Sequence, residues 1–286
     1  MLFLGFQGLN VEACDFVLFN FTAMELKFYK YQGTGNDFII LDGWEGLPEI
    51  SAEQIKRLCD RRFGIGADGL MIISKSEDAD FKMRYFNSDG NPGSMCGNGG
   101  RCLTQFAYSQ SYIGKSTSFV ASDGSHKAVI QNEKDWVSLQ MGNVSEVEVL
   151  ENGDCFLNTG SPHYIKWVDD PSTVDVFSEG KKIRNSSRYF QEGVNVNFVS
   201  VQQGRVEVRT FERGVEDETL SCGTGVTASV LASVFMKKIS SSADGAEVIT
   251  PGGELYVKFH QLNNGFDNVW LEGPAELVFE GTVELI

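Results

Sequence analysis

The sequence is poor in histidine and in clustered positive charge. It contains three histidines, scattered along the chain, and it has neither a C-x-x-C pair nor an H-E-x-x-H motif. Because zinc sites in proteins are built from closely spaced ligands of this kind, we expect no metal centre. Lysine and arginine number 24 against 39 acidic residues, and the net charge is −15. This balance argues against nucleic acid as a partner.

Long apolar runs are also missing. No stretch approaches the roughly 20 apolar residues that a membrane-spanning helix needs, so we expect no membrane partner. Residues 1–23 are largely apolar, but they include Glu12 and Asp15 and lack the positively charged start of a secretory signal peptide. We interpret them as an N-terminal extension that results from a misassigned start codon or is a short non-catalytic segment. A chain that begins at Met24 is expected to be active.

The six cysteines lack the dense, regular spacing of a secreted disulfide scaffold, and we expect a cytoplasmic protein with free thiols. Cys96 and Cys222 stand apart from the rest because each directly precedes Gly-x-Gly. A disulfide between these two would be an oxidised, inactive form. The cysteines that we interpret as small buried hydrophobic side chains are Cys14, Cys59, Cys102 and Cys155.

Two distant stretches share one local pattern. Residues 86–102 read FNSDGNPGSMCGNGGRC, and residues 209–226 read RTFERGVEDETLSCGTGV. The first is a turn rich in Asn, Asp, Gly and Pro, and apolar residues at helical spacing follow both stretches. The pattern predicts that Cys96 and Cys222 each lie at the N-terminus of a helix.

A cysteine at a helix N-terminus has specific chemical properties. The first backbone N–H groups have no partner within the helix and favour negative charge, which lowers a cysteine pKa below its free value of about 8.5. Glycines there let the backbone approach a carboxylate. Two such sites predict an acid whose α-carbon lies between two sulfurs. One thiolate would remove the α-proton and the other thiol would return one, which is racemisation or epimerisation.

No cofactor is expected for this chemistry. No lysine stands beside a recognisable phosphate-binding loop, so pyridoxal phosphate is not predicted. The negative charge that develops on the substrate would have to be stabilised by the backbone N–H groups at the two helix ends.

These stretches closely resemble diaminopimelate epimerases, the pyridoxal-independent enzymes of lysine and cell-wall precursor synthesis. The resemblance runs from about Met24 to Ile286. It rests on several motifs in the family's order, which is more specific than any single motif. The motifs are GTGNDF at 33–38, RFGIGAD at 62–68, NSDG at 87–90, CGNG at 96–99, SPH at 161–163, VN at 194–195, ERG at 212–214 and CGTG at 222–225.

The resemblance implies an α+β fold with two pseudo-symmetric domains. Each would be a strongly curved, mostly antiparallel, barrel-like sheet around a central helix, with the active site in the interdomain cleft. In this chain the N-terminal domain would span residues 24–141, the C-terminal domain residues 142–274, and residues 275–286 would form a final strand that returns to the first domain. The family also implies a homodimer.

The resemblance assigns roles to individual residues in the interconversion of LL- and meso-2,6-diaminopimelate. Cys96 and Cys222 would be the acid and the base, and His163 and Glu212 would tune their pKa values. Arg213 would bind the distal carboxylate, because its planar fork matches that group. The residues expected to bind substrate are Asn36, Asn87, Gly97, Asn98, Ser161, Asn195, Glu212, Arg213, Gly223 and Thr224.

The chain departs from the common family pattern at two positions, with Gly69 in place of glutamine and Ser161 in place of asparagine. Two alternative functions remain. A proline or hydroxyproline racemase also uses two cysteines, but its substrate has no distal carboxylate for Arg213. A non-catalytic amino acid binding protein would need neither cysteine. Phenazine-biosynthesis isomerases resemble the family but lack the paired thiols.

Overall fold

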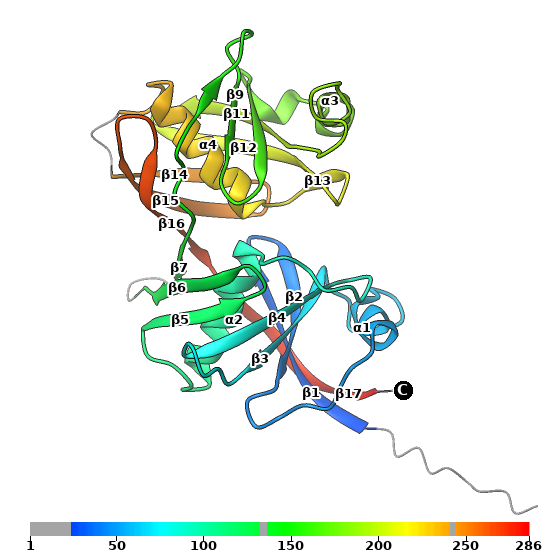
Figure 1. Ribbon diagram of the computed structural model, residues 1–286. Coiled ribbons are helices and arrows are strands. Elements are labelled where there is room, and N and C mark those ends of the chain that lie inside the picture. Colours follow the sequence, from blue (N-terminus) through cyan, green and yellow to red (C-terminus); the bar gives the residue numbers. More distant parts are fainter. Residues whose placement is uncertain (1–23, 132–135, 241–243, 286) are drawn as a thin grey trace, which may run out of the picture.

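The computed structural model describes residues 24–131, 136–240 and 244–285. The predictions for residues 1–23 and for Cys14 lie outside the described residues. Figure 1 shows two lobes, each with a curved sheet around one helix, α2 (Gly97–Ser109) in one lobe and α4 (Gly223–Phe235) in the other. The predicted α+β fold with two similar halves is confirmed.

The first lobe carries the short helix α1 (Ala52–Cys59) beside its sheet. Ser51 and Gln54, three residues apart, form a reciprocal capping box at the start of this helix. The strands of this lobe are β1 (Met24–Gly33), β2 (Asn36–Asp42), β3 (Gly69–Ser74), β4 (Phe81–Asn87), β5 (Ser116–Ala121), β6 (Gly124–Ile130) and β7 (Trp136–Gln140).

The second lobe carries two short helical elements besides α4. Residues 171–184 form two elements, a 3₁₀ turn, η1 (Pro171–Thr173), and the helix α3 (Val176–Arg184), because Asp170 and Asp175 each cap a separate start. The strands of this lobe are β8 (Glu148–Val149), β9 (Cys155–Asn158), β10 (Pro162–Trp167), β11 (Asn195–Gln202), β12 (Arg205–Glu212), β13 (Asp217–Thr219), β14 (Gly245–Thr250), β15 (Gly253–Gln261) and β16 (Phe266–Pro274).

The two lobes repeat one order of strand pairing. From β1 through β7 successive neighbours pair antiparallel, parallel, antiparallel, parallel, antiparallel and antiparallel. The series β9, β10, β11, β12, β14, β15, β16 gives the same order. In each series the central helix follows the fourth of these strands. This repetition indicates an internal duplication.

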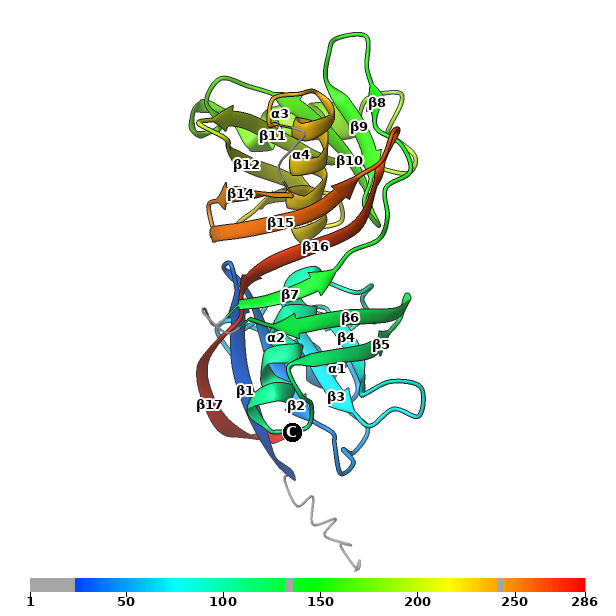
Figure 2. The same ribbon diagram turned by 90° about the vertical axis from the view of Figure 1, so that its left-hand side faces the viewer.

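One strand pairing and the chain itself join the lobes. The last strands of the two series, β7 and β16, pair antiparallel with each other. The chain then continues into β17 (Glu276–Leu285), which lies antiparallel against β1 along its whole length (Figures 1 and 2). The domain boundaries at residues 141/142 and 274/275 remain our proposal, in which the final strand belongs to the first lobe.

Each central helix is surrounded by its own hydrophobic core. Leu103 and Phe106 of α2 are fully buried, as are Val226 and Val230 of α4. A helix that is apolar on most of its faces is stable only when neighbours enclose it. The cores therefore fix the position of both helices, and with them the two helix N-termini.

Candidate active site

Cys96 and Cys222 occupy equivalent positions at the start of the two central helices. Cys96 is the N-cap of α2, with φ −108° and ψ 125°, and Cys222 is the N-cap of α4, with φ −110° and ψ 110°. Neither side chain caps its own helix. The prediction that each cysteine lies at a helix N-terminus is confirmed.

The two helix ends lie against each other. A Cβ atom added to Gly223 would lie 3.8 Å from Cα of Gly97 and 3.0 Å from a methyl carbon of Leu271 on β16. Across this contact, Nδ2 of Asn98 donates a hydrogen bond to the carbonyl oxygen of Ser221 at 3.0 Å. The fold thus brings the two cysteine motifs into one site, and a side chain at position 223 would have to displace Leu271.

The Cys96 thiol is held by a chain of amide side chains. Its Sγ lies 3.5 Å from Oδ1 of Asn36, and the same oxygen accepts from Nδ2 of Asn98 at 3.3 Å. Nδ2 of Asn36 in turn donates to a carboxylate oxygen of Asp68 at 2.7 Å. Two predicted binding residues, Asn36 and Asn98, therefore contact the site directly, and Asp68 joins it.

The Cys222 thiol lies beside an acidic side chain. Its Sγ is 3.5 Å from Oγ1 of Thr224, and the charge of the buried Glu212 carboxylate acts on the thiol. Glu212 also accepts a hydrogen bond from Oγ1 of Thr219 at 2.8 Å. Burial raises the pKa of Glu212, and the nearby carboxylate of Asp68 raises it further. Glu212 is thus the acidic side chain whose charge acts on Cys222.

The pKa values of both thiols differ from the prediction. Burial raises the pKa of Cys96 and of Cys222, and the charge of Glu212 raises both further. The backbone N–H groups of Gly99, at Cys96, and of Gly225, at Cys222, act in the opposite direction but do not compensate. The prediction that the helix ends lower the thiol pKa is therefore wrong in its net effect, because loss of solvent outweighs the helix-end donors.

Three further predicted residues form a polar cluster where β10 and β11 begin. Nδ2 of Asn195 donates to Oγ of Ser161 at 2.8 Å, and the backbone N–H of Arg213 donates to Oδ1 of Asn195 at 2.8 Å. The Arg213 guanidinium lies 3.5 Å from the same Ser161 oxygen and donates to the carbonyl oxygen of Glu192 at 2.9 Å. Arg213 directly follows Glu212, so this cluster adjoins the Cys222 side of the site.

His163 lies in the core, and no described hydrogen bond joins it to either thiol. It is fully buried, Nδ1 lies 3.1 Å from Nδ2 of Asn197, and its ring packs against the first turn of α4 near Gly225. Burial, with the charge of Arg213, lowers the pKa of His163 to about 3. Since Oδ1 of Asn197 accepts from Thr210, its Nδ2 faces the histidine and the ring proton is on Nε2. The ring is therefore neutral at physiological pH.

A sequence model of the diaminopimelate epimerase family matches residues 28–147 and 155–278. This chain belongs to the diaminopimelate epimerase family. Among curated relatives, the diaminopimelate epimerase of Flavobacterium psychrophilum is 52% identical over 260 residues, covering 90% of this chain and 100% of the relative. That of Chlorobaculum tepidum is 44% identical and covers 88% and 99%, respectively.

Solved structures with the same fold are more distant in sequence. A phenazine biosynthesis protein of the PhzF family from Bacillus anthracis has a TM-score of 0.67 at 16% identity, covering 91% of this chain and 99% of that one. A hydroxyproline epimerase from Agrobacterium vitis has a TM-score of 0.66 at 16% identity, covering 91% and 93%. These likenesses establish the fold that this diaminopimelate epimerase family member adopts.

Two residues near Cys96 were missed by the sequence analysis. Tyr85 packs against Gly69, where an added Cβ would lie 2.5 Å from its ring, and its pKa is raised by burial and by Cys96. Arg101 of α2 is fully buried and donates to Asn98. The signal for Arg101 was present in the sequence, because a charged residue in the first turns of an otherwise enclosed helix needs a partner or a function.

No described hydrogen bond links Asn87 to either sulfur. It ends β4, and its backbone N–H donates to the carbonyl oxygen of Asn91 at 2.9 Å. Its predicted role in substrate binding remains a prediction.

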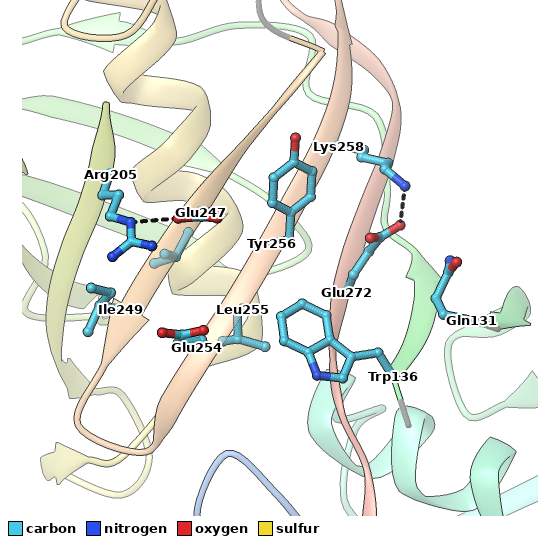
Figure 3. A pocket seen from close by; sticks show the side chains of 11 residues that line it. Gln131, Trp136, Arg205, Glu247, Ile249, Glu254, Leu255, Tyr256, Lys258 and Glu272 are labelled. Atoms are coloured by element: carbon cyan, nitrogen blue, oxygen red, sulfur yellow. Dashed lines mark hydrogen bonds and ion pairs between the residues drawn. The ribbon is translucent and has the colours of Figure 1, made fainter. Parts of the chain in front are cut away.

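A cavity of about 450 Å³ lies away from the cysteines, on the outer side of β14 to β16 (Figure 3). The cations at its wall are already paired, Arg205 with Glu247 at 2.6 Å and Lys258 with Glu272 at 2.8 Å. Neither cysteine lines it, so we assign the chemistry to the facing helix ends.

Within the described ranges no set of three or more His, Cys, Asp or Glu side chains is arranged to hold a metal ion. No helix in those ranges is long and apolar enough to cross a membrane.

Proposed function

We propose that this protein interconverts LL- and meso-2,6-diaminopimelate by cofactor-independent proton transfer at the α-carbon. The observation that carries the proposal is the pair of N-cap cysteines, Cys96 and Cys222, at two helix ends that lie against each other. The chain's membership of the epimerase family supports the choice of substrate.

The proposed reaction is a balanced exchange of protons between two sulfurs. The thiolate of one cysteine takes the α-proton, and the electron pair of the broken C–H bond moves onto the α-carbon and its carboxylate. The thiol of the other cysteine then donates its proton to the opposite face. Which cysteine acts as base depends on the configuration of the incoming carbon. Backbone N–H groups at Gly97, Asn98, Gly223 and Thr224 stabilise the developing charge.

Thiolate formation at Cys222 is assisted by Glu212. The charge of this carboxylate acts on the thiol, and burial raises the pKa of the carboxylate above its ordinary value. A carboxylate that accepts the thiol proton removes the cost of releasing that proton into a buried site. His163, neutral and packed beneath the first turn of α4, is proposed to act on Cys222 only through that turn.

The polar cluster of Ser161, Asn195 and Arg213 supports recognition of the distal end of the substrate. A guanidinium fork binds a carboxylate through two parallel hydrogen bonds, and Glu212 and the amide oxygens accept from an ammonium group. Asn36 and Asn87 are proposed to bind from the first lobe.

The proposed setting is the cytoplasm, in lysine and peptidoglycan precursor synthesis, as a homodimer. Support for the dimer comes from β17, where Leu277, Val278 and Phe279 are between 46% and 55% exposed. Adjacent exposed apolar side chains are commonly covered by a partner.

The proposal is tested by incubating the protein, under reducing conditions, with LL-diaminopimelate, L-proline and trans-4-hydroxy-L-proline, and separating the stereoisomers of each. Formation of meso-diaminopimelate alone is the expected result. Conversion of proline or hydroxyproline, with diaminopimelate unchanged, would instead assign a racemase function.

A further inference from the structure

Arg101 is a buried positive charge without a counter-ion among the described residues. Its side chain is fully buried, and Nε and Nη1 have no hydrogen-bond partner. The guanidinium lies against glycines of two strands, Gly33 of β1 and Gly273 of β16. A Cβ added at Gly33 would be 3.4 Å from Nη2, and a Cβ added at Gly273 would be 3.3 Å from Nε. Burying an unpaired charge is costly, so an arginine in this place calls for a functional explanation.

The guanidinium fixes the orientation of one amide. Nη2 donates to Oδ1 of Asn98 at 3.0 Å and lies 3.5 Å from Oγ1 of Thr34. Because a guanidinium can only donate, the amide oxygen of Asn98 must face Arg101. Its Nδ2 group must then face away, toward Oδ1 of Asn36 at 3.3 Å and the carbonyl oxygen of Ser221 at 3.0 Å.

The orientation of the Asn98 amide affects the surroundings of both cysteines. On one side, Oδ1 of Asn36 accepts from Asn98 while its Nδ2 donates to Asp68, so the oxygen is the atom that faces Cys96. On the other side, Ser221 directly precedes Cys222 in the chain. A single side chain, Asn98, therefore ties the Cys96 partner in one lobe to the Cys222 backbone in the other.

We propose that Arg101 is a positioning residue of the two-thiol site, which orients Asn98 and supplies a fixed positive charge beside Cys96. This inference rests on the proposed epimerase function. A bound reacting carboxylate and one thiolate bring two negative charges to the helix ends, and an unpaired guanidinium in low-dielectric surroundings stabilises them.

The electrostatics agree with this geometry. Arg101 lowers the pKa of the Cys96 thiol, against the larger effect of burial, and Glu212 raises it. Cys96 in turn raises the pKa of Tyr85 and of Cys222. The other thiol close to Arg101 is that of Cys102. The charged or titratable side chains that bear on the experiment are Tyr85, Cys96, Arg101, Cys102, Glu212 and Cys222.

The experiment compares Arg101→Gln, which removes the charge, with Arg101→Lys, which keeps it. The first readout is the pH dependence of Cys96 alkylation by iodoacetamide, followed by peptide mass spectrometry. The second is kcat and KM for LL-diaminopimelate. For Arg101→Gln we expect Cys96 alkylation to move to higher pH and kcat to fall about 100-fold, with KM changed less than about threefold. For Arg101→Lys we expect a near-normal alkylation profile and a loss in kcat of about 10-fold.

Arg209→Gln is the matched control. Arg209 is a partly buried arginine of β12 that is bonded to Glu218 at 2.7 Å and to the backbone carbonyl group of Pro171, and none of its described hydrogen bonds goes to a thiol or to Asn98. The Arg209→Gln substitution is expected to lower thermal stability and to leave the pH dependence of Cys96 alkylation unchanged. This control therefore distinguishes a general loss of stability from a loss of the positioning that Arg101 provides.

An Arg101→Gln variant that folds and shows wild-type kcat together with a wild-type Cys96 alkylation profile would overturn the inference. If Arg101→Gln does not fold, Arg101→Lys decides, because unchanged kcat in that variant contradicts a positioning role that depends on the guanidinium fork. If the wild type does not epimerise diaminopimelate at all, the proposed function fails, while the alkylation profiles still test the role of Arg101.

Discussion

At the scale of single residues, the charge of Glu212 acts on the Cys222 thiol. Like-charge repulsion from the carboxylate raises the thiol pKa. The carboxylate therefore opposes formation of the thiolate while the carboxylate is charged. In the proposed mechanism it also accepts the proton that leaves the thiol. These two effects can be separated by substitution.

We predict that Glu212→Gln makes Cys222 more reactive but the enzyme slower. Removing the negative charge lowers the pKa of Cys222, so its alkylation by iodoacetamide should begin at lower pH. Epimerisation should fall by about 100-fold or more, because the proton acceptor is lost. Both rates are measured on the same preparation. Slower alkylation of Cys222 in the variant would show that Glu212 does not repel the thiolate.

The buried histidine makes stability depend on pH. His163 has a folded pKa of about 3 against an unfolded value of about 6.5, so below pH 6.5 the unfolded chain binds the extra proton. Its contribution to stability is full above pH 6.5 and is lost as pH falls. The loss between pH 7 and pH 5 is expected to be about 2 kcal/mol in the free energy of unfolding.

Urea unfolding of wild type and His163→Gln at pH 7 and pH 5 measures this effect. The variant has no titrating ring, so the difference between its two values should be smaller than that of wild type by about 2 kcal/mol. Equal differences for the two proteins would mean that His163 titrates normally in the fold.

At the scale of elements, β3 and β4 depend on a glycine opposite an aromatic ring. A Cβ at Gly69 would lie 2.5 Å from the ring of Tyr85 and 2.6 Å from the carbonyl oxygen of Phe86. The ring therefore occupies the space that a side chain at position 69 would need. Glycine, which has no Cβ, fits this position.

We predict that Gly69→Ala lowers the free energy of unfolding by about 1–3 kcal/mol, the usual cost of overpacking. Gly114→Ala is the control, because nothing lies within 4 Å of the added Cβ, and it should change stability by less than about 0.5 kcal/mol. Both are compared by thermal and urea unfolding. A neutral Gly69→Ala would mean that Tyr85 moves aside without cost.

The sequence predicts elements better than it predicts the site. The capping box at Ser51 and both cysteine-headed helices follow from local patterns, which act over three or four residues. The direction of the thiol pKa shifts was predicted wrongly, since burial is a property of the folded chain.

At the scale of the whole molecule, the sites depend on contacts between residues far apart in the chain. Asn98 and Ser221 are 123 positions apart, and Asn36 and Cys96 are 60 apart. No single-sequence pattern specifies such pairs. The motifs indicated which residues matter, whereas the contact of α2 with α4, and the role of Arg101 within it, required the structure.

We predict that Val278→Lys weakens the proposed homodimer. Val278 on β17 is 55% exposed, so a lysine can be accommodated in the single chain, but a charge at a subunit interface must be desolvated. Sedimentation velocity should show a dimer for wild type and a concentration-dependent shift to monomer for the variant. Val149→Lys, at a residue of β8 that is 47% exposed, should remain dimeric. An equal shift in both variants, or none, would place the interface elsewhere.

The central claim, that Cys96 and Cys222 exchange protons with one α-carbon, is tested most directly by deuterium uptake from D₂O. LL-diaminopimelate is incubated under reducing conditions with wild type, Cys96→Ser and Cys222→Ser, and α-deuteration and stereochemistry are followed together. We predict exchange with conversion to the meso isomer by wild type, and severe loss of both in each variant. Conversion by either serine variant at a rate close to that of wild type would contradict the two-thiol mechanism.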